Sequence, residues 1–210
     1  AIDANVTNTV ALCPGYSGGS FAQRTELPAH RHRLPGLAVA AGLGGLVGSV
    51  LLVITSEALF RTLVPVLILF ACALLALQDR IRGWLGTRGA PVEARNAPWL
   101  LAVVFVGAVY GGYFGAGLGV MLLAVLGLAI RQDLNRLNAV KQVLSLVINV
   151  VSAAFFAFSG HVVWSFALVM SVTALVGGHL GGRIAGRLDP RKLRAVVIVA
   201  GVAVAVRFWV

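Results

Sequence analysis

Residues 110–119 read YGGYFGAGLG and lie inside an uncharged run of 35 residues, from Asn96 to Ile130. One straight helix of that length would measure about 52 Å, whereas the hydrocarbon core of a bilayer is about 30 Å thick. Two complete crossings would need about 40 residues and a turn, which is more than the run contains. The length of this run therefore predicts a helical hairpin with two short limbs, 97–112 and 118–130, joined by the glycine-rich segment.

The composition is that of an integral membrane protein. Hydrophobic residues make up 59% of the 210 residues, charged residues only 11%, and the mean hydropathy is +0.93. A soluble domain would carry about 25% charged residues. The net charge of +10 comes from basic residues spread over short segments between apolar runs, which argues against nucleic acid as a partner. We expect an all-α polytopic protein whose surroundings are the lipid bilayer.

The remaining apolar stretches predict six further membrane crossings. The stretch from 142 to 182 contains 41 residues without Asp, Glu, Lys or Arg, which is enough for two crossings. Polar groups are frequent in the first stretch, so it is expected to face other helices or a cavity. The predicted spans are 4–23, 34–56, 58–78, two within 142–182, and 195–210.

The distribution of basic residues predicts the orientation of these spans. Segments 24–33, 79–95, 131–141 and 183–194 hold 15 of the 17 Lys and Arg residues. Under the positive-inside rule these four segments are predicted to be cytoplasmic loops. All four can lie on one side only if the glycine hairpin enters and leaves the membrane on the same side. The charge pattern thus supports the hairpin independently of its length.

The topology also predicts an inverted repeat. We divide the chain into 1–78 with three spans, a linker at 79–95, and 96–210 with the hairpin and three spans. The three spans after the hairpin run in the opposite sense to the three before the linker. A short match, Ala4-Asn5-Val6 against Leu137-Asn138-Ala139, opens the first full span of each half. In repeats of this kind the binding site lies between the halves, near the membrane midplane.

The glycine segment is the predicted substrate site. Non-helical backbone at membrane depth is tolerated where protein buries it or where it lines a watery cavity, and transporters use it to aim backbone dipoles at substrates. The second limb would begin near Gly119, where a helix N-terminus attracts anions. The alternative is that these glycines only let helices approach each other or let the chain reverse. The predicted binding residues of this segment are Tyr110, Gly111, Gly112, Phe114, Gly115, Gly117 and Gly119.

Polar residues of the neighbouring spans complete the predicted site. Lys141 could attract an anion, or it could be an interfacial lysine that follows the positive-inside rule. Asn138 could bond the substrate or the broken backbone. An unpaired amide is costly inside a span, so Asn149 either bonds another helix or faces the substrate path, and the same alternatives hold for Asn5 and Asn8.

Four motifs resemble the TauE/SafE family of membrane transporters. YGGYFGAGLGVMLL, RLNAVKQVLSLVINVVSAAFFAFSG and GGHLGGRIAGRL resemble that family's second repeat, and ANVTNTVALCPGYSGG resembles part of its first. The resemblance covers essentially the whole chain. It implies a secondary transporter that exports small anions, sulfite or organosulfonates, across the bacterial inner membrane. Members of the family usually begin with a first glycine-rich hairpin, which is expected to be missing here.

Two other function classes compete with the transporter. A membrane-embedded enzyme would need a nucleophile and base or a set of metal ligands inside the membrane, and no such cluster is evident in the sequence. His30 and His32 alone are a weak metal signal. We therefore expect no catalytic residues, metal site or cofactor. An accessory membrane subunit without transport activity is the other alternative.

Overall fold

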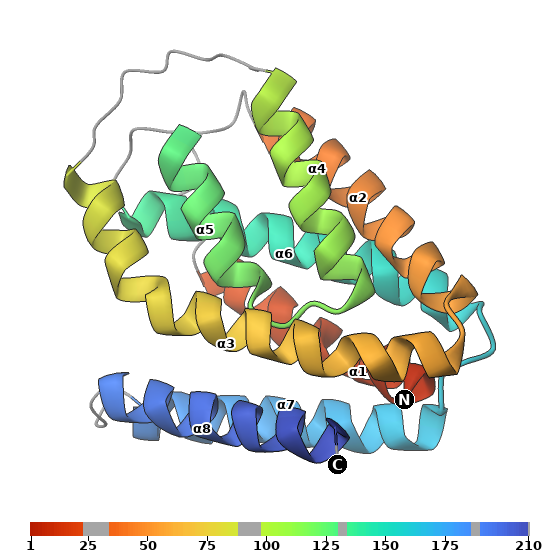
Figure 1. The fold of residues 1–210 in the computed structure, drawn as a ribbon. Coiled ribbons are helices and arrows are strands. Elements are labelled where there is room, and N and C mark those ends of the chain that lie inside the picture. The colour runs from red at the N-terminus through yellow and green to blue at the C-terminus, as the bar shows by residue number, and fades with distance from the viewer. Residues whose placement is uncertain (23–33, 88–97, 130–133, 186–189, 210) are drawn as a thin grey trace.

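The structure is a computed structural model that describes residues 1–22, 34–87, 98–129, 134–185 and 190–209. Throughout these residues the secondary structure is helical, without strands, so the all-α prediction is confirmed. Figure 1 shows the arrangement of the helices. They are α1 (Ile2–Ala22), α2 (Leu34–Ile54), α3 (Glu57–Thr87), α4 (Pro98–Tyr113), α5 (Leu118–Ala129), α6 (Leu134–Ala157), α7 (Trp164–Ala185) and α8 (Pro190–Trp209).

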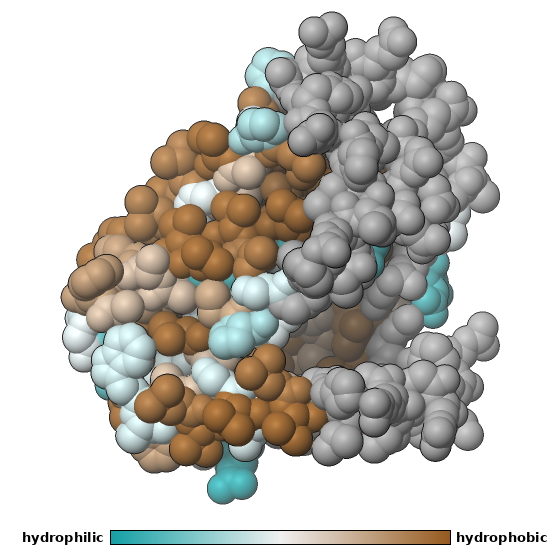
Figure 2. Space-filling view, turned by 180° about the vertical axis from the view of Figure 1, so that it is seen from behind, coloured by the Kyte–Doolittle hydropathy of each residue, from teal (hydrophilic) through white to brown (hydrophobic). Residues whose placement is uncertain are grey.

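Several helices have the length and apolar character of membrane spans. Three helical stretches within the described residues have a high mean hydropathy over 18 residues. The values are 2.4 for Leu34–Ile54, 2.4 for Glu57–Leu77 and 1.8 for Leu137–Ala157. Much of their apolar surface is exposed, as on the face shown in Figure 2, where hydrophobic residues cover most of the coloured area. Apolar surface of that extent is unusual for a soluble monomer and suits contact with lipid. The polytopic membrane class is therefore confirmed.

The predicted glycine hairpin is present. Its limbs are α4 and α5, and residues 114–117 between them are not helical. The limbs pack against each other, since a Cβ placed on Gly107 of α4 would lie 3.6 Å from Cε of Met121 of α5. Gly115 and Gly117 have φ angles of 80° and 74°, a left-handed conformation that side chains other than glycine adopt only at a cost. These two glycines let the chain reverse within four residues.

The helices extend beyond the uncharged runs. α3 continues to Thr87, α6 begins at Leu134 and α8 begins at Pro190, so parts of the segments predicted as loops are helical. These parts are rich in Arg, Lys and Leu, which favour helix, and proline suits the first helical position of α8. The predicted loop 24–33 lies outside the described residues, as do 88–95, 131–133 and 186–189 of the other three basic segments. Their cytoplasmic placement remains a prediction.

Glycines bring α2 and α4 into close contact. A Cβ placed on Gly48 of α2 would lie 2.1 Å from the Val109 carbonyl oxygen of α4. From the other side, a Cβ placed on Gly112 would lie 2.1 Å from the Gly45 carbonyl oxygen. Nothing larger than hydrogen fits at either position. The backbones of α2 and α4 therefore touch at these glycines.

The other helices pack around this pair and the hairpin. α6 contacts α1, α2, α4 and α5, and therefore lies at the centre of the bundle. α7 packs on α1 and α8 packs on α3, so that α7 and α8 form one edge in Figure 1, while α2 and α4 lie on the other side. One cluster of buried hydrophobic residues joins α2, α4, α5 and α6. A second cluster joins α1 to the start of α3 and the end of α6.

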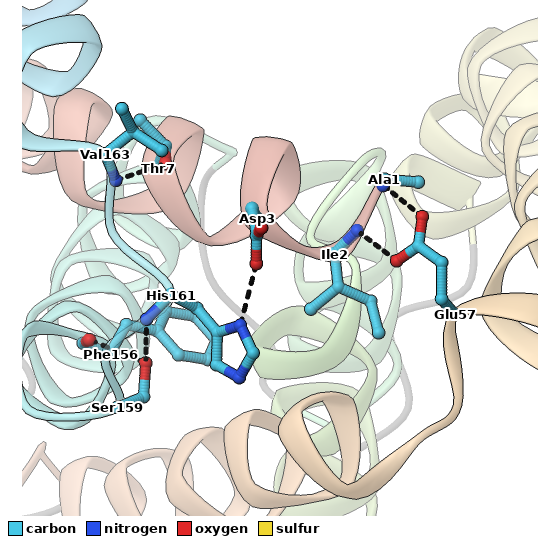
Figure 3. A network of polar contacts seen from close by, with 9 residues as sticks. All are labelled: Ala1, Ile2, Asp3, Thr7, Glu57, Phe156, Ser159, His161 and Val163. Atoms are coloured by element: carbon cyan, nitrogen blue, oxygen red, sulfur yellow. Dashed lines mark hydrogen bonds and ion pairs between the residues drawn. The ribbon is translucent and has the colours of Figure 1, made fainter.

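A network of polar contacts surrounds the start of α1 (Figure 3). His161, in the connection between α6 and α7, lies with its Nδ1 2.7 Å from an oxygen of Asp3. Thr7 Oγ1 accepts a hydrogen bond of 3.1 Å from the Val163 N–H. On the other side, Glu57 at the start of α3 accepts one of 3.1 Å from the Ile2 N–H. The short turns after α2 and α6 therefore meet at the same end of the bundle.

Candidate functional site

Two side chains hold the break between α4 and α5 in place. The last carbonyls of a helix have no partner within it. Asn5 of α1 supplies one, because its Nδ2 donates a hydrogen bond of 3.1 Å to the Tyr113 carbonyl at the end of α4. The Tyr110 hydroxyl donates one of 2.6 Å to the Ala116 carbonyl within the break. The broken backbone is thus tied both to α1 and to its own first limb.

Aromatic rings of α3 support the same segment. The Phe70 ring meets the Tyr110 ring edge to face at a centroid distance of 5.5 Å, and the Phe60 ring meets the Tyr113 ring at 5.9 Å. Such pairs stabilise by about 0.5–1.5 kcal/mol beyond their buried area. α3 therefore backs the end of α4 with rigid rings.

The start of α5 leaves backbone donors at the break. Leu118 N–H donates to the Gly115 carbonyl at 3.2 Å, and Val120 and Met121 both donate to the Gly117 carbonyl. The N–H groups of Ala116 and Gly117 donate to no backbone carbonyl of the described residues. Unused N–H groups and the positive end of the helix dipole make such a terminus suitable for an anion.

A cavity of about 390 Å³, which we call the break cavity, lies between this segment, α1 and α6. Its volume is within the usual range for sites that bind small molecules. Seven of the twelve predicted binding residues line it, although they come from three separate parts of the chain. They are Asn5, Asn8, Gly111, Phe114, Gly115, Gly117 and Asn149.

Asn149 is the most unusual of these residues. Its Oδ1 is buried and has no hydrogen-bond partner among the described residues. The nearby Ser152 hydroxyl, by contrast, donates to the Gly45 carbonyl at 3.4 Å. A buried amide oxygen without a partner costs about 1–3 kcal/mol, and such groups in membrane helices mark functional positions. Among the described residues, this oxygen therefore forms no hydrogen bond to another helix, which was one of the two roles predicted for Asn149.

The other five predicted residues lie outside the cavity wall. Tyr110 holds the break from behind, and Gly112 lies in the contact with α2. A Cβ placed on Gly119 would be 3.8 Å from Nζ of Lys141, so the start of α6 does abut the hairpin as predicted. Asn138 lies one turn before Lys141 on α6 and is partly buried. Asn5 ties down the broken backbone, a role that was also considered for Asn138.

Seven lining residues were not predicted, but most follow helical spacing. On α1 the wall continues from Asn5 and Asn8 at intervals of three or four residues, which is one face of a helix. Ser152 follows Asn149 in the same way on α6. Periodicity around the predicted asparagines was the signal that could have found these residues. The unpredicted lining residues are Thr9, Leu12, Tyr16, Ala116, Leu118, Ile148 and Ser152.

Comparison with known proteins agrees with this architecture. The family model for the sulfite exporter TauE/SafE matches residues 1–208. The chain belongs to the TauE/SafE family. A "Probable membrane transporter protein" of Haemophilus influenzae is 25% identical over 161 residues, which are 75% of this chain and 60% of that protein. The "Probable membrane transporter protein ORF9" of Sinorhizobium sp. is 23% identical over 192 residues, 90% of this chain and 70% of that protein.

These relatives are longer than the chain, which spans about 60–70% of their length. No solved structure matches the chain. Membership of a transporter family favours a transporter over an enzyme. Among the described residues, no three His, Cys, Asp or Glu side chains come together as metal ligands would.

Proposed function

We propose that this protein is a membrane transporter for small anions, with sulfite or an organosulfonate as the substrate class and export as the direction. The observation that carries the proposal is the break cavity, where a glycine-rich break, the N-terminus of α5 and asparagines of two other helices meet. The family description adds the substrate class and direction.

The donors around the cavity suit an anion. Backbone N–H groups at the start of α5 cost no side-chain entropy to hold in place, and the helix dipole adds about half a positive charge there. The amide groups of Asn8 and Asn149 can donate to oxyanions. Lys141 lies beside Gly119 at the same helix terminus and adds positive charge behind the cavity.

We further propose that the two parts, 1–78 and 96–210, are inverted repeats that rock against each other. The packing supports this relation, because the proposed equivalents α1 and α6 contact each other, as do α3 and α8. α2 contacts α6, and its proposed equivalent α7 contacts α1. The site then lies where the two parts meet, as in other transporters built from inverted repeats.

Anion flux into proteoliposomes tests the proposal. We would offer sulfite, sulfoacetate, sulfate, acetate and chloride, each with and without a proton or sodium gradient. Saturable flux of sulfite or sulfoacetate is the expected result. Absence of flux for every anion would contradict it and favour an accessory role.

A variant at Asn149 connects that flux to the cavity. Asn149→Ala is expected to reduce flux about tenfold, because a lost hydrogen bond to a charged ligand is worth about 1.5–3 kcal/mol. Thr173→Ala is the matched control, since the Thr173 hydroxyl is exposed and bonds only carbonyls of its own helix. Equal flux in the two variants would place the binding site elsewhere.

A further inference from the structure

A second cavity adjoins the break cavity. It has a volume of about 290 Å³ and is lined by Leu12, Gly15, Tyr16 and Gln142; we call it the side groove. Leu12 and Tyr16 line the break cavity as well. These two side chains, one helical turn apart on α1, are therefore the partition between the two spaces.

The side groove leads toward one end of the bundle. The break cavity is lined by α1 from Asn5 to Tyr16 and by Ile148, Asn149 and Ser152 of α6. The groove is lined by later residues of α1 and by Gln142, which is earlier on α6. At 1.5 Å per residue, Gln142 lies about 10 Å nearer the start of α6 than Asn149. The groove thus continues the break cavity toward the end where α1 finishes and α6 begins.

The helix is weakened next to the partition. Pro14 lies inside α1 and has no N–H to donate to the Val10 carbonyl. A Cβ placed on Gly15 would have no neighbouring atom within 4 Å among the described residues. The turn that carries Tyr16 therefore lacks one backbone bond and has free space beside it. Proline and glycine at such a position allow a helix to bend.

One polar residue lines the groove, and a lysine precedes it in the sequence. Gln142 contributes an amide, and the adjacent Lys141 has its Nζ close to Gly119 at the start of α5. An anion moving from the break cavity along this direction would stay within reach of positive charge, which a helix N-terminus and a lysine both provide.

We propose that Tyr16 is a gate between the break cavity and the side groove, and that the groove is the aqueous route by which small sulfonate-type anions leave or enter the break cavity. The bend at Pro14 and Gly15 swings the Tyr16 ring aside and joins the two spaces. This inference rests on the proposed function, since it assigns a path to the substrate of the same site.

Cysteine labelling tests whether the groove is aqueous. In a Cys13→Ala, Cys72→Ala background with intact flux, Gly15→Cys is treated with sulfonatoethyl methanethiosulfonate, an anionic reagent that is itself a sulfonate. Val39→Cys is the matched control, because Val39 lies five residues from the end of its helix and its side chain is 61% exposed on an apolar face. Gly15→Cys is expected to react at least about tenfold faster, because charged reagents do not enter hydrocarbon. Sulfoacetate is expected to slow that reaction.

Substitutions of graded size test the gate. Flux is expected to fall progressively from Gly15→Ala through Gly15→Leu to Gly15→Trp, with about a tenfold loss for tryptophan, because these side chains fill the groove. Val39→Trp controls for adding an indole to the apolar surface. Tyr16→Ala is expected to remove the partition and allow leak of sulfate and chloride. Tyr16→Phe keeps the ring, so it is expected to leak less sulfate and less chloride than Tyr16→Ala.

The outcomes separate the gate from the proposed function. In one outcome sulfite or sulfoacetate is transported, and Gly15→Cys reacts with membrane-permeant N-ethylmaleimide but not with the anionic reagent. This result would show that the groove faces lipid and would overturn only the gate. Labelling without any anion flux, and without protection by sulfoacetate, would overturn both. Flux with labelling and protection supports both.

Discussion

At the scale of single residues, three polar side chains near the glycine break have different roles. Asn5 and Tyr110 satisfy carbonyls of the break, whereas Asn149 keeps a buried oxygen without a partner among the described residues. We therefore expect the first two to contribute mainly to stability, and we propose that the third contributes mainly to function. Substitutions distinguish the two roles, because a stabilising bond changes unfolding while a binding group changes flux.

Asn5→Ala is expected to lower the free energy of unfolding by about 1–2 kcal/mol, because the Tyr113 carbonyl is left without its donor inside the protein. The unfolding midpoint in detergent measures the effect. Ser17→Ala is the control, since the Ser17 hydroxyl bonds only the Cys13 carbonyl of its own helix. Identical midpoints for the two variants would show that Asn5 does not hold the break.

At the scale of elements, glycines serve two separate purposes. Those of α2 and α4 remove side chains from a helix contact, whereas Gly115 and Gly117 provide backbone conformations that other residues resist. The structural alternative therefore describes both sets of glycines, and the substrate-binding role of the segment stays a prediction.

Gly48→Ala is expected to destabilise the pair of α2 and α4 by about 1–3 kcal/mol, because its Cβ would overlap the Val109 carbonyl and force the helices apart. Gly42→Ala on the same helix is the control: its Cβ would meet only methyl groups of Val147 and Val151, both at 3.6 Å. Thermal unfolding in detergent compares them. Helix propensity favours alanine equally in both variants, so equal destabilisation would contradict the role of the contact with α4.

Gly115→Ala and Gly117→Ala are each expected to cost about 1–2 kcal/mol through the left-handed backbone. Gly119→Ala is expected to be less damaging, because Gly119 is helical and its Cβ would have ordinary contacts with Lys141 at 3.7 Å or more. The same unfolding assay applies. A greater loss of stability for Gly119→Ala would contradict the conformational role of the break.

At the scale of the whole molecule, α1 connects the parts that transport would involve. Its start is bonded to the turns after α2 and α6, its middle lines the break cavity, and its later turns line the side groove. Its interior Pro14 lies in the turn between Leu12 and Tyr16, the two residues that line both the cavity and the groove. A movement of α1 relative to α6 would therefore change both spaces together, which is the kind of coupling that alternating access requires.

The sequence by itself determined the fold class, the hairpin and the set of helices. Length against bilayer thickness and the scarcity of charge are local properties, and each acts within a single stretch of chain. Residues 97–112 and 118–130 could be predicted as limbs because no other arrangement of 35 apolar residues satisfies the membrane. The asparagines could be predicted because an amide is costly wherever it lies in a span.

Only the tertiary structure decided which predicted residues share a cavity. Asn5, Gly115 and Asn149 are far apart in the chain, and their meeting depends on how α1, the break and α6 pack. Helix register likewise decides that Asn5 bonds the Tyr113 carbonyl of the break. The close approach of α2 to α4 decides that Gly112 lies in a helix contact. Periodicity specifies the faces of a helix, but the neighbour that each face meets depends on the packing of the whole bundle.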